Sequence, residues 1–390
     1  MKIRSLIDSE SGLHYSRWST IAIDGPLRRQ LNLQTIPSAF EFLPASFRIT
    51  SLPPPRPTPS PRPPSTLSAT MSAPIRQMPL VCPGHNRGIV ELQYSPPGPE
   101  GVFLMSACLD GIPMLRDGLS GDWVGSFVGH KGAVWGACIS TDASLAATAG
   151  ADFTARLWDA VNGECKTTLT QKHICKSVAF SADSSRLLTA GNTNSINIYD
   201  VNACEDTPVA FLAPADPKAK TTVKLARYVR SGSDIVVSAT SGEREEKVLS
   251  IWDVRSGKRE RTLPLGSVAK SGELTPDGKF LTVTAGDATV SVYDLEKMER
   301  TMQVAVPVST ESASLRYPQM DMMVTGGQDL TVRKFDLKKD GTASEVEANR
   351  GHHGPVWVLR FAPDGESYAS GSDDGTIRLW KTTIDPSLVA

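Results

Sequence analysis

A dipeptide motif recurs along this chain at nearly constant spacing, and this recurrence limits what the chain can fold into. Each copy joins an aromatic residue or an arginine to an aspartate, except that the last copy ends in lysine. Successive copies lie 41 to 45 residues apart, with one longer step of 53 residues. A unit of this length cannot bury a core alone, so the copies must stack on one another. The seven copies are Arg116-Asp117, Trp158-Asp159, Tyr199-Asp200, Trp252-Asp253, Tyr293-Asp294, Phe335-Asp336 and Trp380-Lys381.

Residues 121–159 show what one copy contains. Gly129-His130 is followed by an apolar run, a polar turn, a second apolar run ending at Thr148 and a third ending in Trp158-Asp159. Runs of five to seven residues between turns are typical of strands rather than helices. Gly-His openings and Trp-Asp endings every ~40–45 residues are the signature of WD40 propeller blades. We therefore predict an all-β fold, a seven-bladed WD40 β-propeller with four antiparallel strands per blade, over residues 74–382.

The recurring polar residues have a structural interpretation. In such blades the loop histidine, a serine or threonine on the second strand, the turn aspartate and the tryptophan form a buried hydrogen-bonded tetrad, and a fully satisfied network of this kind specifies one packing. The blades are numbered here by the seven dipeptides in chain order. Blades two and seven supply all four residues, and blade one has Arg116 in place of tryptophan. The predicted members are His85, Ser106 and Asp110; His130, Thr148, Asp152 and Trp158; and His352, Ser370, Asp374 and Trp380.

The middle blades depart from this pattern. Blade three has His173 and Thr189 but Thr193 where the aspartate belongs. Blades five and six keep Asp287 and Asp329 but lack the histidine. We expect these blades to be less tightly held than blades two and seven.

The two ends of the repeat region are expected to meet. Residues 78–82 precede the first Gly-His pair, and the last blade ends its third strand at Trp380. The simplest closure places 78–82 on the outside of blade seven, which removes an open sheet edge. Residues 383–390 then form a short tail.

Residues 1–73 do not share the repeat, and eight of the twelve residues from Pro53 to Pro64 are proline. Such a segment is polyproline-like or disordered, so we predict a disordered N-terminal extension. Three interpretations stay open. In the first, Met71 is the natural start and the mature protein lacks the extension. In the others, the extension is a solvated tail with Pro-Arg motifs that a partner domain could bind, or it is a targeting segment.

Charge and motif content argue against several classes of function. Beyond residue 73 the chain carries 33 basic and 38 acidic residues, which disfavours tight binding to phosphate backbones and leaves RNA contact only indirect. No run of 18 apolar residues occurs, so no membrane span is expected. Phosphate-loop, nucleophile-elbow and zinc-protease motifs are absent, and six cysteines occur without a CxxC pair. We therefore predict no enzyme activity, no catalytic residue, no cofactor, no metal and a reducing compartment.

Candidate partner-binding residues lie where loops border the propeller channel. Positions just after the histidine and just before the aspartate border one face. The candidates there are Trp135, Ala151, Trp357 and Asp373. A tryptophan at such a rim is a typical anchor for a protein partner. The alternative is that each indole packs against the neighbouring blade.

Several stretches are more specific than the repeat punctuation. They include GHKGAVWGA (129–137), ADFTARLWDA (151–160), KHI (172–174) and most of 354–380. With them, nearly all of 71–381 resembles the serine-threonine kinase receptor-associated protein family, also called unr-interacting protein. The nearest competing family is the WD40 i-subunit of eukaryotic translation initiation factor three.

This resemblance implies a non-enzymatic scaffold in the cytoplasm and nucleus. Members of the family are similar to the SMN-complex subunit that docks on Sm-fold Gemin proteins and assists assembly of spliceosomal small nuclear ribonucleoproteins, hence mRNA splicing. Animal relatives also bind the TGF-β receptor and translation regulators. This chain ends ten residues after Trp380 without the family's acidic C-terminal extension, so contacts of that extension are not carried over.

Overall fold

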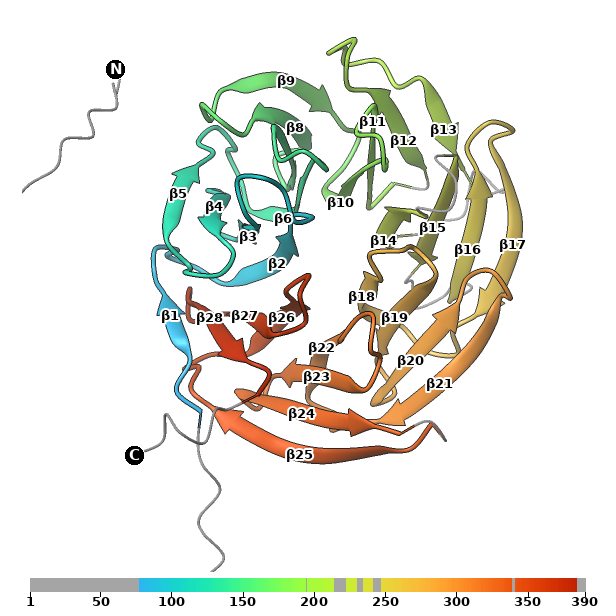
Figure 1. The fold of residues 1–390 in the computed structure, drawn as a ribbon. Helices are drawn as coiled ribbons and strands as arrows, with labels where there is room; N and C mark the ends of the chain where they lie inside the picture. The colour runs from blue at the N-terminus through green and yellow to red at the C-terminus, as the bar shows by residue number, and fades with distance from the viewer. Residues whose placement is uncertain are drawn as a thin grey trace, which may run out of the picture. The chain divides into compact units, whose positions relative to one another are not determined.

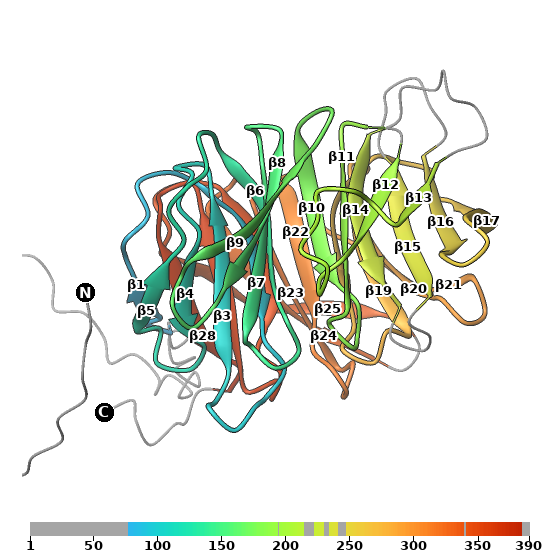
Figure 2. The same ribbon diagram turned by 90° about the horizontal axis from the view of Figure 1, so that it is seen from above.

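A computed structural model describes residues 77–193, 195–213, 222–229, 234–240, 247–338 and 341–383. These residues form seven antiparallel four-stranded sheets arranged as blades in a ring (Figure 1). Seen at right angles in Figure 2, the strands run between the two faces of the ring. The all-β, seven-bladed propeller predicted from the repeat is confirmed.

The blades contain the following strands, from the innermost to the outermost. Blade one has β2 (Ile89–Tyr94), β3 (Phe103–Cys108), β4 (Met114–Asp117) and β5 (Trp123–Ser126). Blade two has β6 (Val134–Ile139), β7 (Leu145–Gly150), β8 (Thr154–Asp159) and β9 (Cys165–Thr170). Blade three has β10 (Cys175–Phe180), β11 (Arg186–Gly191), β12 (Ile196–Asp200) and β13 (Ala210–Leu212). Blade four has β14 (Val223–Tyr228), β15 (Ile235–Thr240), β16 (Val248–Asp253) and β17 (Lys258–Pro264).

The remaining three blades complete the ring. Blade five has β18 (Ala269–Leu274), β19 (Phe280–Ala285), β20 (Thr289–Asp294) and β21 (Glu299–Ala305). Blade six has β22 (Thr310–Leu315), β23 (Met322–Gly327), β24 (Thr331–Leu337) and β25 (Ala343–Arg350). Blade seven has β26 (Val356–Phe361), β27 (Ser367–Ser372), β28 (Ile377–Lys381) and β1 (Leu80–Cys82).

The hydrophobic core lies between neighbouring blades. In the described part of the chain the buried apolar residues gather into seven clusters, and each cluster joins side chains of two adjacent blades. Burial differs between inner and outer strands: every residue of β23, the second strand of blade six, is buried, whereas β17, the outermost strand of blade four, is almost wholly exposed. Each blade therefore needs both neighbours to bury its two faces, as the repeat length predicts.

The ring is closed by strands from opposite ends of the repeat region. β1 pairs with β28 in antiparallel register, with Leu80 opposite Leu379 and Cys82 opposite Ile377. This pairing confirms the closure predicted for residues 78–82. Cys82 is buried in the cluster between blades seven and one, so the closing strand also contributes to the core.

Some predictions fall on parts of the chain that the structure does not describe. They concern the extension 1–73, of which no residue is described, and the tail, where only residue 383 is described. No helix in the described residues is long and apolar enough to cross a membrane.

Candidate functional site

Blades two and seven each contain a continuous chain of polar side chains. In blade two, Nδ1 of His130 lies 2.9 Å from Oδ2 of Asp152, and its Nε2 lies 2.7 Å from the Thr148 hydroxyl. The Trp158 indole nitrogen completes the chain by donating to the same hydroxyl at 2.8 Å. Blade seven repeats the arrangement, with distances of 3.1, 2.7 and 2.8 Å along Asp374, His352, Ser370 and Trp380.

The chemistry of the end groups fixes the direction of these hydrogen bonds. An indole N–H can only donate and an ionised carboxylate can only accept. Trp158 therefore donates to Thr148, whose hydroxyl donates to Nε2 of His130, whose Nδ1–H donates to Asp152. The imidazole is neutral and held in one tautomer, so it serves as a structural link.

Burial keeps these histidines neutral. It lowers the pKa of His352 to about 4 and also lowers the pKa of His130 and His85. Burial alone would raise the pKa of Asp374, but the Thr376 hydroxyl and the backbone amides of His353 and Thr376 outweigh it and lower that pKa to about 2. A neutral imidazole facing an ionised carboxylate is the stable state near neutral pH.

The glycine of each Gly-His pair has a packing role. A Cβ on Gly129 would lie 2.7 Å from a guanidinium nitrogen of Arg156 and 3.1 Å from the Trp158 ring. A Cβ on Gly351 would meet Arg378 at the same 2.7 Å. The missing side chain thus lets the arginine and the tetrad tryptophan approach the loop.

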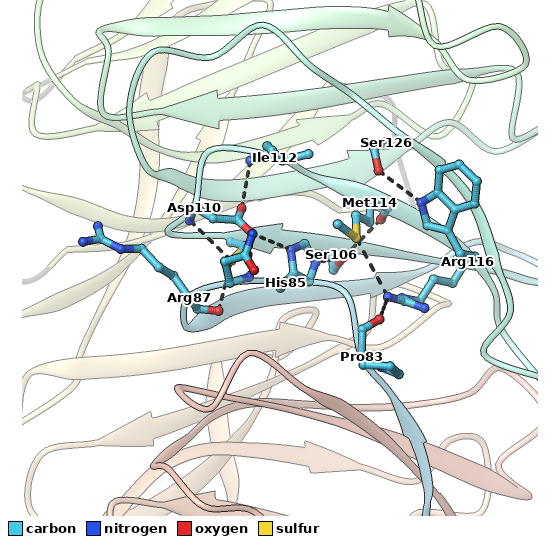
Figure 3. A network of polar contacts seen from close by, with 12 residues as sticks. Pro83, His85, Arg87, Ser106, Asp110, Ile112, Met114, Arg116 and Ser126 are labelled. Atoms are coloured by element: carbon cyan, nitrogen blue, oxygen red, sulfur yellow. Dashed lines mark hydrogen bonds and ion pairs between the residues drawn. The ribbon is translucent and has the colours of Figure 1, made fainter. Parts of the chain in front are cut away.

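Blade one keeps three members of the tetrad and replaces the tryptophan (Figure 3). Nδ1 of His85 lies 3.1 Å from Asp110, and its Nε2 lies 2.8 Å from the Ser106 hydroxyl. That hydroxyl lies 3.1 Å from the backbone carbonyl of Met114. Arg116 is buried and donates to the carbonyls of Gly121 and Pro83, so it ties the loop before β2 to the blade.

The donor atoms of His85, Cys108 and Asp110 lie within 4.8 Å of one another, which raises the question of a metal. The Cys108 thiol instead lies 3.1 Å from the carbonyl of Arg87. In blade seven the Ser372 hydroxyl makes the equivalent bond to the Gly354 carbonyl at 2.8 Å. Burial raises the pKa of Cys108 to about 12, so the thiol stays protonated and is a poor metal ligand. The cluster is therefore explained by its structural hydrogen bonds.

The assignment of His173 to the tetrad of blade three is wrong. His173 is exposed, and its Nδ1 accepts from the backbone amide of Ile174. Gln171 occupies the tetrad place: its Oε1 accepts from the Thr189 hydroxyl at 3.1 Å, and its Nε2 donates to the Tyr199 hydroxyl at 2.9 Å. Gln171 precedes Thr189 by 18 residues, the spacing between His130 and Thr148, so this spacing could have identified it.

The other middle blades use fewer polar contacts. In blade four the Trp252 indole donates to Ser238 at 2.9 Å. In blade six Asp329 forms an ion pair with Arg333 at 2.6 Å in place of a histidine contact. In blade five the carboxylate of Asp287 accepts from the Thr289 hydroxyl.

A second set of residues lies at the start of the innermost strands. In every blade the pairing register shifts by one residue between the first and third positions of this strand. Such a bulge turns the extra residue out of the ladder and re-aims its side chain. All seven bulged residues line one cavity of about 330 Å³. These residues, here called the mouth ring, are Val90, Trp135, Lys176, Lys224, Lys270, Glu311 and Trp357.

The cavity contains three of the four partner-binding candidates. Trp135 and Trp357 belong to the mouth ring, and Asp373 lies beside them on the wall. Ala151 is half-buried and does not line the cavity. Trp135 is 36% exposed, and Trp357 is half-buried with its indole nitrogen 3.2 Å from Oδ1 of Asp373. Neither indole belongs to the apolar clusters between blades, so both offer surface to a ligand.

A charged layer lies deeper along the innermost strands. Arg360 and Arg227 pair with Glu91 at 2.6 and 3.6 Å. Burial raises the pKa of the nearby Glu273 to about 7. Glu91 borders both the mouth cavity and a second cavity of about 270 Å³ at the other ends of these strands. Sequence reasoning missed this layer, because its members lie on different blades and share no motif.

Comparison with known proteins agrees with this architecture. The family described as WD domain, G-beta repeat matches residues 121–159, 163–200 and 344–381. A Gallus gallus protein named serine-threonine kinase receptor-associated protein is 42% identical over 310 residues, covering 80% of this chain and 84% of its own. The Homo sapiens protein of that name is 40% identical with the same coverage.

Two further relatives extend the comparison. A Dictyostelium discoideum protein of the same name is 40% identical over 305 residues, covering 78% of this chain and 99% of its own. The Drosophila willistoni eukaryotic translation initiation factor 3 subunit I is 29% identical over 318 residues, covering 76% and 95%. The identity and coverage of the chicken, human and Dictyostelium proteins show that this chain belongs to the serine-threonine kinase receptor-associated protein family of WD40 propellers.

Proposed function

We propose that the chain is a non-enzymatic scaffold that binds other proteins at the mouth ring. The observation that carries this proposal is the pair of partly exposed indoles, Trp135 and Trp357, at bulged positions of blades held by complete tetrads. Aromatic anchors on a rigid frame lose little conformational freedom on binding, which favours affinity. The described histidines and carboxylates around the tetrads already have structural partners, which favours a binding role over catalysis.

The finer proposal is a role in ribonucleoprotein assembly. The resemblance of residues 71–381 to the family supports Sm-fold subunits, including Gemin-type proteins of an SMN complex, as the partners. In this role the protein works in the cytoplasm and nucleus, assists assembly of spliceosomal particles and meets RNA only through its partners. The relatives' name, which speaks of association with a kinase receptor, supports receptor partners as a further proposal, and translation regulators are a third class.

An alternative function is a subunit of a translation initiation factor. It is supported by the relative named eukaryotic translation initiation factor 3 subunit I, which is 29% identical against 42% for the receptor-associated protein of chicken. The larger identity favours the first function.

Affinity purification of the tagged full-length chain, followed by mass spectrometry, distinguishes the two functions. We expect Gemin-type and Sm-fold proteins with the wild type and their loss with a Trp135→Ala, Trp357→Ala double variant. Recovery of initiation-factor subunits without Sm-fold proteins would replace the first function with the second. A Val161→Ala variant serves as a control, because Val161 is an exposed apolar residue outside the cavity wall.

A further inference from the structure

The mouth ring has two chemically different arcs. Blades seven, one and two contribute Trp357, Val90 and Trp135, which form an apolar arc. Blades three, four and five contribute three lysines in succession, which form a cationic arc. Blade six contributes Glu311. Because all seven positions are equivalent bulges, their side chains line the same cavity, with the apolar arc on one part of its wall and the cationic arc on another.

Only one lysine of the cationic arc has a carboxylate partner in the described part of the chain. Nζ of Lys270 lies 3.0 Å from Oε1 of Glu311 and donates to the Thr310 carbonyl at 2.9 Å. The ion pairs of the described residues include none with Lys176 or Lys224. Within the described residues, the lysines of the arc that lack an ion-pair partner are therefore those of blades three and four.

Lys176 and Lys224 come from neighbouring blades and line the same cavity. Lys176 is half-buried, with its ammonium 5.8 Å from the centre of the Trp135 ring. Burial, and secondly the charge of Lys224, lower the pKa of Lys176. An anion placed between the two ammonium groups would stabilise both charges.

The carboxylates on the wall are already engaged. Glu91 pairs with Arg360 and Arg227 beneath the ring, and Asp373 accepts from the Trp357 indole. A cavity of about 330 Å³ lies at the lower end of the range for ligand pockets, so it has room for a few side chains only. A fitting occupant carries an acidic group for one arc and an apolar group for the other.

We propose that the mouth ring receives an acidic loop or terminus of a partner protein, with an aspartate or glutamate between Lys176 and Lys224 and an adjacent apolar side chain against Trp135 and Trp357. This inference rests on the proposed scaffold function and adds the chemistry of the partner. Apolar contact supplies affinity, and the carboxylate fixes the orientation in which the partner enters.

Single-stranded RNA is the competing ligand, because bases stack on indoles and phosphates contact lysines. The same wall, however, carries the carboxylates of Glu91, Glu311 and Asp373. A continuous phosphate backbone would pass close to these groups, whereas a peptide brings its charge to one place. The local pattern of charge therefore favours an acidic peptide.

The test uses the full-length protein and a fluorescein-labelled peptide with two adjacent aspartates beside a phenylalanine. A matched peptide has asparagines in place of the aspartates. We expect the acidic peptide to bind more tightly, and the Lys176→Gln, Lys224→Gln double variant to weaken its binding roughly tenfold. The preference should shrink as salt rises from about 0.05 to about 0.5 M, because ions screen partly exposed charges.

The matched control is a Lys131→Gln, Lys172→Gln double variant. It removes the same charge from exposed lysines on the loops before β6 and β10, which do not line the cavity. We expect it to bind the acidic peptide like the wild type. Both double variants should have the melting temperature of the wild type, since the four side chains lie outside the apolar clusters.

The possible results separate this inference from the proposed function. Equal binding of the two peptides, equal loss in both lysine variants, or tighter binding of a uridine oligonucleotide would overturn the acidic-peptide assignment. If Sm-fold proteins are recovered equally by the Lys176, Lys224 variant and the wild type, the inference is wrong and the scaffold function stands. If the acidic peptide binds as expected but the wild type recovers neither Sm-fold nor other proteins, the scaffold function is wrong.

Discussion

The carboxylate of Asp152 accepts hydrogen bonds from two side chains and from the backbone. It accepts from His130, from the amide of Lys131 and from the hydroxyl of Thr154. We expect Asp152→Ala to lower the free energy of unfolding by about 2–4 kcal/mol, because the buried imidazole loses its acceptor. Urea unfolding, followed by tryptophan fluorescence, measures the loss.

Asp329→Ala is the matched comparison in blade six. One oxygen of Asp329 pairs with Arg333 and the other has no hydrogen-bond partner, while Arg333 also contacts Glu345. The arginine keeps a partner after the substitution, so we expect a smaller loss than for Asp152→Ala. Equal losses at the two aspartates would contradict a stabilising role for the tetrad.

Histidine burial also predicts how stability depends on pH. The pKa of His352 is about 4 in the folded protein and ~6.5 in an unfolded chain. Between these values the unfolded chain binds a proton that the folded protein does not, so stability falls as the pH drops from ~6.5 to ~4. From pH 7 to pH 5, His352 alone should cost about 2 kcal/mol of unfolding free energy.

A His352→Gln variant tests this pH dependence. Glutamine does not titrate, and Gln171 already fills the tetrad place of blade three. We expect unfolding free energies measured at both pH values to fall less in this variant than in the wild type. His85 and His130 should continue to contribute, because burial lowers their pKa values as well. An unchanged pH dependence would mean that His352 does not titrate in the expected range.

Individual tetrad residues could be predicted in blades whose sequence contains all four residue types of the motif. Blades two and seven contain the histidine, hydroxyl, aspartate and tryptophan at matching spacings. In blade three the histidine motif predicts His173, which lies two residues beyond the correct position. The tetrad residue there is Gln171, whose amide offers a donor and an acceptor as an imidazole does. Spacing is more reliable than residue identity here, because the backbone fixes the position and several polar side chains can link it.

At the scale of strands, closure depends on β1. Its three residues pair with β28, and Cys82 packs in the cluster between blades seven and one. Deleting 71–82 exposes the edge of β28 and removes part of this core, so we expect a lower melting temperature and aggregation. Differential scanning fluorimetry and light scattering measure both effects.

A point substitution in β1 provides the control for this deletion. Leu80 is 50% exposed, so Leu80→Ser keeps the strand and removes little buried surface. We expect this variant to scatter no more light than the wild type and to melt at nearly the same temperature. If the deletion variant has the same melting temperature as the wild type, β1 is dispensable and the closure does not stabilise the ring.

The bulges explain which parts of the mouth ring could be predicted from sequence. Trp135 and Trp357 follow a tetrad histidine by five residues, so they could be found from that anchor. Lys176 follows Gln171 by the same five residues. Counting from His173 instead of Gln171 misses it. Lys270 and Glu311 lie in blades without a tetrad histidine, so the sequence there gives no fixed point from which to count. The extra residue of a bulge is a feature of strand pairing, which becomes visible only in the structure.

At the scale of the whole molecule, the core and the proposed binding surface lie in different places. Its core lies between blades, whereas the mouth ring lines a cavity where all seven innermost strands begin. Substitutions in the ring should therefore alter binding with little effect on folding. Under the proposed scaffold function, this separation would let residues of the ring differ with the partner while the core between blades stays the same.

The paired substitutions Trp135→Ala and Trp357→Ala test this separation. Each removes a large, partly exposed aromatic surface, so we expect each to weaken partner binding by about 2 kcal/mol or more with little change in melting temperature. Trp158→Ala is the control: its ring is buried and its indole donates to Thr148, so it should lower stability strongly. Melting curves and pull-down of Sm-fold partners give both readouts. If Trp135→Ala and Trp357→Ala leave both unchanged, the partner must dock elsewhere, and the outer edge of blade one, where Trp123 is 61% exposed, becomes the next surface to test.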